Sequence, residues 1–240
     1  MGMAEPEMFE QSDLSDKQFE DVLEKLAEIP SHQSPITGQV AVLCFRFMED
    51  TGCRVNETIH VKKKDINFRT RILLVTQPKS TAKCKCSKWK NKDSFSRARV
   101  LVSADPNCPQ CHGKGRWHKP QRTTITPRII AALKNYCDEL KDDELLFPIS
   151  RVSLWKWGKK AGEMANINIF QQKDEKFIEG VFLHLFRQMC AKRMLRDAKL
   201  DNYKHELVIC KLRHSVQIVT ERYTKIDINY LLGWENKIYQ

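Results

Sequence analysis

The sequence predicts a mainly α-helical domain with a small antiparallel β-sheet, an α+β fold interrupted by a small inserted module. Apolar residues recur at helical spacing through most of the chain. Two short segments rich in β-branched residues, 72–76 and 122–126, have the composition of strands that pair with each other. The roughly 40 residues between them are too many for a simple hairpin loop, and they contain two pairs of cysteines. We therefore expect this loop to be structured.

The first helix is predicted after a disordered linker formed by residues 1–14, which show no periodicity. Ser15 and Gln18 have the spacing of a capping box, in which each side chain bonds the backbone of the other residue. The apolar residues that follow repeat at helical spacing up to Pro30. These residues are Phe19, Val22, Leu23 and Leu26.

A second helix is predicted from Ser34 and Pro35, an N-cap and first-turn pair, to Gly52. A short helical turn that carries Arg54 follows, and the chain then reaches the strand 72–76. Four more helical segments are expected after the second strand, at 129–136, 152–164, 181–198 and 202–212.

Composition limits the class of protein. The chain has 240 residues, 41% of them hydrophobic, which is enough for one large or two small domains. No apolar run approaches the roughly 20 residues that span a bilayer, and the acidic start lacks the apolar region of a secretory signal. Nine cysteines without an export signal indicate a reducing compartment. We expect a cytoplasmic protein without membrane partners, associated with the nucleoid if the source is prokaryotic.

The positive charge is concentrated in one segment. The net charge of +11 indicates a polyanionic partner, most often nucleic acid. Residues 80–119 hold ten Lys and Arg residues against two acidic ones, Asp93 and Asp105. A basic surface without a specific partner is the alternative that charge alone leaves open.

The cysteines of this basic segment have the spacing of a metal site. Two pairs, CxC and CPxC, are separated by 21 residues, which is typical of one zinc ion held by four thiolates. Four protein ligands leave no open position, so the zinc would be structural. His112 and His118 stay open as replacements for a cysteine, and four free thiols in a basic loop are the alternative. The predicted ligands are Cys84, Cys86, Cys108 and Cys111.

Five residues have the chemistry needed to bind and attack a phosphodiester. Guanidinium groups bind phosphate oxygens through paired hydrogen bonds, histidines donate a further bond or move a proton, and a tyrosine hydroxyl acts as a covalent nucleophile. These residues are Arg54, His184, Arg187, His214 and Tyr223.

The helix that carries two of these residues also has an apolar stripe. At about 100° per residue, His184 and Arg187 fall opposite this stripe. We therefore expect both side chains to project away from the packing. The stripe consists of Phe182, Leu185, Phe186 and Met189.

The order R…HxxR…H(x8)Y, with Thr51-Gly52-Cys53-Arg54-Val55-Asn56-Glu57 around the first arginine, resembles the tyrosine recombinase (phage integrase) family over most of residues 15–230. Family members usually have Leu-Gly-His where this chain has Leu212-Arg213-His214. The family's catalytic lysine directly precedes the turn of a hairpin. Lys79 occupies that place, with Lys83 and Lys119 as alternatives, and Glu57 is expected to orient neighbouring groups.

The resemblance implies a catalytic domain over 15–225. The zinc-binding insertion 80–119, which we place at a hairpin tip from the cysteine spacing, interrupts this domain and is not part of the family's minimal pattern. It implies a site-specific recombinase or integrase, a DNA strand transferase that acts on double-stranded DNA through a 3′-phosphotyrosyl intermediate. Tyr223 would attack the phosphate, Lys79 would protonate the leaving 5′ oxygen, and the other four catalytic residues would surround the phosphate. No catalytic metal and no nucleotide would be needed.

The resemblance also implies self-association on DNA as a dimer or tetramer. The tail 226–240 is apolar enough to contact a neighbouring protomer. Family members usually have an N-terminal DNA-clamping domain, so either it has been removed here or the zinc insertion compensates for it. Two other functions stay open: a zinc-stabilised DNA-binding protein with an inactive recombinase site, and a DNA-relaxing enzyme similar to type IB topoisomerases.

Overall fold

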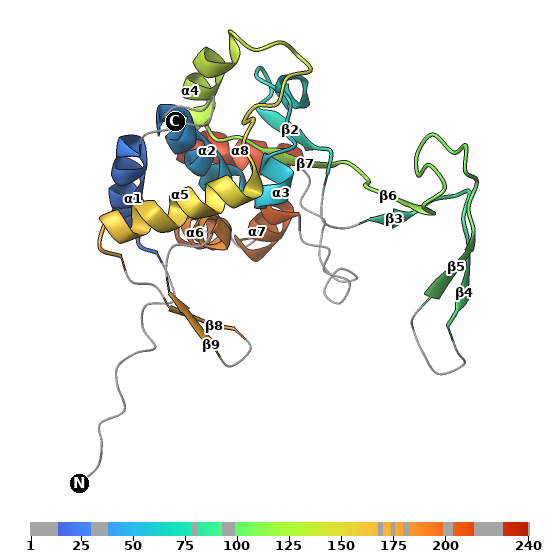
Figure 1. The fold of residues 1–240 in the computed structure, drawn as a ribbon. Coiled ribbons are helices and arrows are strands. Elements are labelled where there is room, and N and C mark those ends of the chain that lie inside the picture. Colours follow the sequence, from blue (N-terminus) through green and yellow to red (C-terminus); the bar gives the residue numbers. More distant parts are fainter. Residues whose placement is uncertain are drawn as a thin grey trace.

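The computed structural model of the protein describes residues 14–29, 38–77, 81–92, 99–167, 170–173, 176–179, 183–198, 204–213 and 228–239. These residues form a body of packed helices with a small sheet at one side, and a narrow module extends outward from the sheet (Figure 1). The predicted fold class, mainly α with a small antiparallel sheet, is confirmed.

The N-terminal helices follow the predicted local signals. Helix α1 (Asp16–Glu28) begins at the capping box, where the Gln18 backbone N–H donates to the Ser15 hydroxyl and the Ser15 N–H donates to the Gln18 side chain. Helix α2 (Gly38–Thr51) ends at Gly52, whose φ of 63° is the left-handed conformation that glycine tolerates best. The predicted start of this helix at residues 34–35 lies outside the described residues.

The short sheet consists of β1 (Ile66–Asn67), β2 (Ile72–Val75) and β7 (Gln121–Thr124), in the order β1-β2-β7. Helix α3 (Val55–Thr58) and the 3₁₀ turn η1 (Lys63–Asp65) lead into it. Strands β2 and β7 pair antiparallel, with Leu73 opposite Thr123. The predicted pairing of the two β-branched segments is therefore confirmed.

The helices of the second half are α4 (Pro127–Cys137), α5 (Arg151–Met164), α6 (Leu183–Asp197) and α7 (Lys204–Leu212). Between α5 and α6 lies a hairpin of β8 (Phe170–Lys173) and β9 (Lys176–Glu179), which the sequence patterns did not predict. No described helix has both the length and the apolar character needed to cross a membrane.

The main core surrounds α2, which packs against α1, α4 and α6. Phe45, Phe47 and Met48 on α2 are fully buried, and the ring of Phe45 lies 4.9 Å from that of Phe186 on α6. Each buried side chain of this size contributes roughly 2 kcal/mol. Because α2 leads directly into Gly52 and Arg54, the core holds the first arginine motif in place.

A second, smaller core lies where α8 (Ile228–Ile238) packs against α7 and β7. Leu231 is fully buried there, and Trp234 is 8% exposed. We expected the tail 226–240 to contact a neighbouring protomer, and this stays a prediction; Leu231 and Trp234 are buried against their own chain. They lie there because apolar residues of α6 and α7, among them Met194 and Leu207, form the rest of this cluster. Any contact between protomers would use other residues or a different position of α8.

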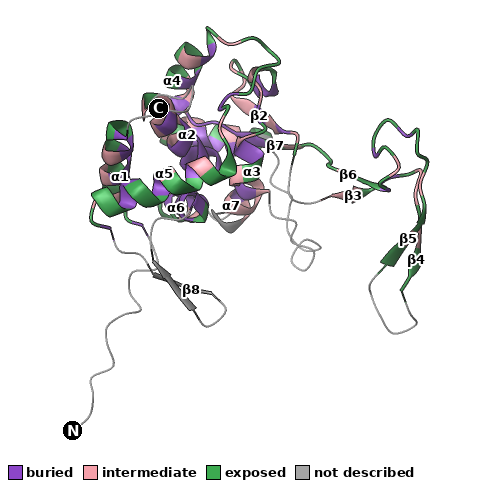
Figure 2. Ribbon diagram, in the orientation of Figure 1, coloured by how far each residue is buried: buried purple, intermediate pink, exposed green. Residues whose placement is uncertain are grey.

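The inserted module lies between β2 and β7 in the sequence. Strand β3 (Ala82–Lys83) pairs with β6 (Arg116–Trp117), and β4 (Lys88–Asn91) pairs with β5 (Arg99–Ser103), each pair antiparallel. Figure 2 shows that β4 and β5 are exposed over most of their length, whereas the helices of the body have buried faces.

Candidate functional site

The candidate site lies where the ends of α2 and α7 meet α6. The guanidinium of Arg187 on α6 donates to the carbonyl oxygens of Gly52, after α2, and of Leu212, at the end of α7. A Cβ atom at position 52 would lie 2.4 Å from Leu212 Cδ2, so only glycine permits this close approach. Arg187 therefore connects three segments that are distant in the sequence.

The structure corrects one expectation about Arg187. We expected its side chain to project away from the packing, but it is only 3% exposed. The cause is tertiary, since α2 and α7 both pack on α6 and enclose the side that periodicity leaves open. Burial, together with the charges of Arg54 and Arg213, lowers the pKa of Arg187 to about 10.

Arg54 is the N-cap residue of α3 and pairs with Glu57 in two ways. Its backbone N–H donates to Glu57 Oε2 at 2.8 Å, and its guanidinium donates to Glu57 Oε1 at 3.0 Å. The Arg54 side chain is 29% exposed, whereas that of Glu57 is 1% exposed. The expected role of Glu57 in orienting its neighbours is what this geometry provides.

Arg213 stands where the family usually has glycine, and it adopts the backbone conformation that glycine would favour. Its φ is 55°, in the left-handed region. Its guanidinium donates to Glu57 Oε2 at 2.6 Å, its side chain is 3% exposed, and its Nε has no hydrogen-bond partner within the described chain. The missing glycine is thus replaced by a third guanidinium held on the same carboxylate as Arg54.

Oppositely charged neighbours determine the pKa shifts of Glu57 and Arg213 in this cluster. Burial alone would raise the pKa of Glu57, but the charge of Arg213 and the hydrogen bonds from Arg54 outweigh it and lower that pKa. Burial likewise opposes the charge of Arg213, yet Cys53 and Glu57 raise its pKa. With one carboxylate among three guanidinium groups, the cluster retains an excess of positive charge suited to an anion.

A buried lysine supports the segment that carries Arg213. The ammonium of Lys211 donates to Glu235 Oε1 on α8 at 2.7 Å and to the carbonyl oxygen of Thr124 on β7 at 3.0 Å. Its side chain is completely buried. Burial lowers the pKa of Lys211, but the charges of Glu235 and Asp50 outweigh this and raise it. The network ties the end of α7 to the sheet and to α8.

The four cysteines predicted as metal ligands lie together in the module. Their Sγ atoms are all within 4.8 Å of one another, with Cys84 and Cys108 at 3.5 Å and Cys86 and Cys111 at 3.3 Å. Zn–S bonds of about 2.3 Å in a tetrahedron require S···S distances of about 3.8 Å, which these separations bracket. The cluster can therefore hold a metal ion.

Backbone groups around the cysteines favour thiolates. The N–H groups of Cys111 and Gln110 lower the pKa of the Cys108 thiol to about 7. Burial, together with hydrogen bonds to the neighbouring thiols, raises the pKa of Cys86 to about 12. Among the described residues the group of candidate ligands contains these cysteines alone, so His112 and His118 are not part of it.

Comparisons with known proteins agree on the fold. No protein-family profile and no curated protein matches the sequence. Among solved structures, the integrase of mycobacterium phage Brujita matches with a TM-score of 0.52 and 13% identity, over 99% of this chain and 60% of that one. XerA recombinase matches with a TM-score of 0.50 and 17% identity, over 94% and 64%. The Tn1549 transposon integrase, solved in complex with circular intermediate DNA, matches with a TM-score of 0.50 and 14% identity, over 92% and 63%.

This chain has the tyrosine recombinase fold. It spans less than two thirds of the length of each of these three proteins. Within the recombinase fold, the structure places Arg54 and Arg187 close enough for their charges to interact. His184 is exposed one helical turn before Arg187 on α6, on a neighbouring position of the helix surface. Predicted residues Lys79, His214 and Tyr223 lie outside the described residues.

Sequence reasoning missed two features of this recombinase fold. Arg213 stands where the family usually has glycine, but nothing in the sequence connects it to Glu57, 156 positions earlier. The buried Lys211 had no signal at all, because a lysine in an amphipathic helix normally reaches solvent. Both depend on contacts between segments that are far apart in the chain.

Proposed function

We propose that this protein is a DNA strand transferase that breaks and rejoins double-stranded DNA through a 3′-phosphotyrosyl intermediate, as a site-specific recombinase or integrase. The convergence of Arg54, Arg187 and Arg213 from three separate segments carries the proposal. Such a cluster is suited to the extra negative charge of a pentacoordinate phosphate, because preorganised donors stabilise developing charge. The recombinase fold, shared with an integrase solved in complex with DNA, supports this assignment.

Each residue has a distinct part in the proposed reaction. The guanidinium of Arg187 uses two contacts on backbone carbonyls, and its remaining donors are directed to the phosphate, since guanidinium has five N–H donors. Arg54 is partly exposed and binds the phosphate from the solvent side. His184 and His214 complete the set of hydrogen-bonding groups around the phosphate.

The covalent step is a substitution at phosphorus. The phenol oxygen of Tyr223 forms a bond to phosphorus as the bond to the 5′ oxygen breaks. The phenol proton passes to a histidine of the site, and the leaving 5′ oxygen receives a proton from Lys79. A strand with a free 5′ hydroxyl then attacks the phosphotyrosine and restores the tyrosine. The sequence requires neither a nucleotide nor a catalytic metal.

The remaining parts of the proposal concern organisation. Residues 15–225 form the catalytic domain, and residues 80–119 form an insertion held by one structural zinc ion on Cys84, Cys86, Cys108 and Cys111. The protein self-associates as a dimer or tetramer on DNA. A cytoplasmic location follows from the cysteine content and stays a prediction.

The decisive experiment traps the intermediate. Duplexes that the protein binds are selected from a randomised pool and prepared with a nick close to the cleavage position, so that a released fragment cannot be religated. The wild type should accumulate a covalent protein–DNA adduct at the 3′ phosphate without added Mg²⁺. Tyr223→Phe keeps the ring and should retain DNA affinity, yet form no adduct.

Matched variants test the assignment of each residue. Tyr203→Phe and Tyr230→Phe should still form the adduct, and Arg54→Ala should lower its rate by about 10² to 10³. An adduct formed by Tyr223→Phe would show that the nucleophile is misassigned. If the wild type binds DNA but forms no adduct on any selected site, the protein is a DNA-binding module with an inactive site.

A further inference from the structure

The β4–β5 ribbon of the module has two different faces. Trp89 lies opposite Leu101, and Lys90 lies opposite Val100. Because successive side chains of a strand point to opposite faces, the first pair occupies one face and the second pair the other. Trp89 and Leu101 are the partly buried residues of the two strands, and the other residues of both strands are exposed. The register shifts between Lys88 and Trp89, so that Lys88 lies opposite Ser103 and Val102 is the extra residue of an irregularity in β5.

The inner face is attached to the cysteine cluster. The Trp89 ring lies under two cations, with Arg116 Cζ at 4.8 Å and Lys83 Nζ at 5.4 Å from its centroid. Leu101 packs against Gly115, where an added Cβ would lie 2.5 Å from Leu101 Cδ1. These contacts fix how the ribbon projects from the module.

The outer face exposes apolar groups between cations. Val100 is 43% exposed and Val102 is 57% exposed, while Lys88 and Lys90 are exposed on the neighbouring strand. Neither lysine forms an ion pair with a carboxylate of the described segments. The outer face therefore combines two apolar side chains with two cations on the same short ribbon.

The positive charge of the ribbon indicates a polyanionic partner. Residues 81–92 and 99–104 contain five lysines and one arginine, and neither segment contains an aspartate or glutamate. Duplex DNA provides phosphates for the lysines, and its major groove, about 12 Å wide, admits a two-stranded β-ribbon. The thymine C5-methyl group lies in that groove and is the apolar feature that a valine side chain can contact. In an RNA duplex the major groove is too deep and narrow for such an insertion.

We propose that the outer face of the β4–β5 ribbon enters the major groove of duplex DNA, where Val100 and Val102 contact thymine methyl groups and Lys88 and Lys90 bind the flanking phosphates. The inserted module is then a sequence-dependent DNA contact of the strand transferase. This inference rests on the proposed function only in taking DNA as the substrate.

The test replaces thymine by uracil, which removes the C5-methyl group and leaves base pairing intact. The full-length protein selects duplexes from a randomised pool, and binding to the selected duplex is measured by fluorescence anisotropy with thymine or uracil at each position. The wild type should lose affinity by roughly fourfold for each contacted methyl group. The double variant Val100→Ala, Val102→Ala should bind both duplexes equally. Val152→Ala, at a valine 60% exposed on α5, should keep the wild-type discrimination.

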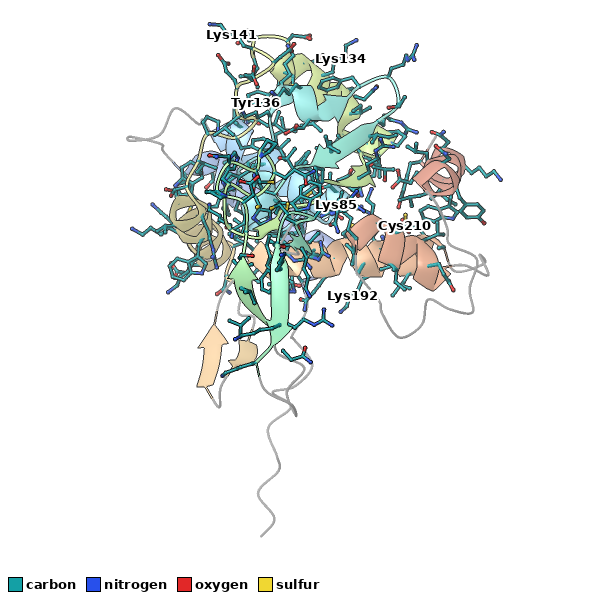
Figure 3. The ribbon with its side chains drawn as sticks, turned by 90° about the vertical axis from the view of Figure 1, so that its right-hand side faces the viewer. Lys85, Lys134, Tyr136, Lys141, Lys192 and Cys210 are labelled. Atoms are coloured by element: carbon teal, nitrogen blue, oxygen red, sulfur yellow. The ribbon has the colours of Figure 1, made fainter. Side chains whose placement is uncertain are left out.

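A second measurement addresses the lysines. Replacing Lys88 and Lys90 by Gln should reduce the slope of log affinity against log salt by up to about two, one for each lost phosphate contact. Replacing Lys134 and Lys141 by Gln is the matched control, because both are exposed and lie far from the ribbon (Figure 3). Their replacement should leave the slope unchanged.

Several results would overturn the inference. These are a selected pool without conserved thymine, equal discrimination by wild type and the double valine variant, or equal affinity for an RNA duplex of the same sequence. The outcome is independent of strand cleavage. Tyr223→Phe should discriminate thymine from uracil as the wild type does. The ribbon contact can therefore be correct even if the strand-transfer proposal is wrong, and the strand-transfer proposal can be correct even if the ribbon contact is wrong.

Discussion

The helical body and the cysteine module of this chain are held together in different ways. The body has a continuous core in which Phe45, Phe147 and Phe186 are fully buried. The buried cluster of the module consists of three cysteines, with Cys86, Ala104 and Trp117 packed against it. Ordering the roughly 30 described residues of the module costs about 1 to 2 kcal/mol of conformational entropy for each residue. The few apolar contacts of the module cannot offset this cost. The comparison indicates that the body folds by apolar burial, and we expect the module to depend on a metal ion held by its cysteines.

Metal removal should produce the largest effect. A structural zinc site contributes about 10 to 16 kcal/mol of apparent binding energy near neutral pH, so a strong chelator should make residues 80–119 sensitive to protease. The unfolding midpoint of the body should change little, because its core does not contact the metal. Purified protein should contain one equivalent of zinc, measured by elemental analysis.

Two cysteine variants separate the regions. Cys108→Ser should release the zinc, whereas Cys137→Ser, buried in the body, should retain it and cost only local stability. A module that stays protease-resistant without metal would show that its few packed residues are sufficient.

Glu57 should give the second largest effect, in the body. Its carboxylate holds two guanidinium groups, and removing one partner of a buried pair costs about 3 to 5 kcal/mol. Glu57→Ala should lower the free energy of unfolding by an amount in this range, measured by denaturant titration. Glu28→Ala, which removes an exposed ion pair with Lys25, should cost less than about 1 kcal/mol.

The pKa of Glu57 predicts how the stability of the protein depends on pH. The pKa of Glu57 in the folded protein lies below its usual value of 4.5, so its ionised form stabilises the fold at neutral pH. That stabilisation should be lost as the pH falls below about 4.5 and through the folded-state pKa. Glu57→Gln should remove this part of the acid dependence. If Glu57→Gln lost stability at acidic pH in the same way as the wild type, other carboxylates would determine the acid dependence.

Local patterns in the sequence were sufficient for most of the fold. The capping box at Ser15, the helix end at Gly52 and the pairing of β2 with β7 all follow from signals within short segments. The spacing of the cysteine pairs likewise predicted a cluster that the structure confirms. Such signals are strong because each depends on residues close in the chain or on a fixed coordination geometry.

The features that the sequence could not predict depend on burial of side chains by segments that are distant in the chain. Periodicity places Arg187 on the polar side of α6, and only the packing of α2 and α7 shows that this side is buried. The apolar residues of 228–239 are compatible with packing against their own chain or against a neighbouring protomer. Only the structure shows that they pack against α7. The pairing of Arg213 with Glu57 is likewise a contact between segments that are far apart in the chain.

The smallest effect concerns Arg213, where backbone and side chain act in opposite directions. Replacement by glycine relieves a left-handed conformation that costs a non-glycine residue about 1 to 2 kcal/mol. It also removes a buried partner of Glu57, worth about 3 to 5 kcal/mol. Arg213→Gly should therefore destabilise the protein by about 1 to 4 kcal/mol, less than Glu57→Ala. Asn166→Gly isolates the backbone effect, because Asn166 is exposed with a φ of 54°, and it should be neutral or slightly stabilising. If Arg213→Gly were as stable as the wild type, the pair with Glu57 would contribute no more to folding than the about 1 to 2 kcal/mol of backbone strain that glycine relieves.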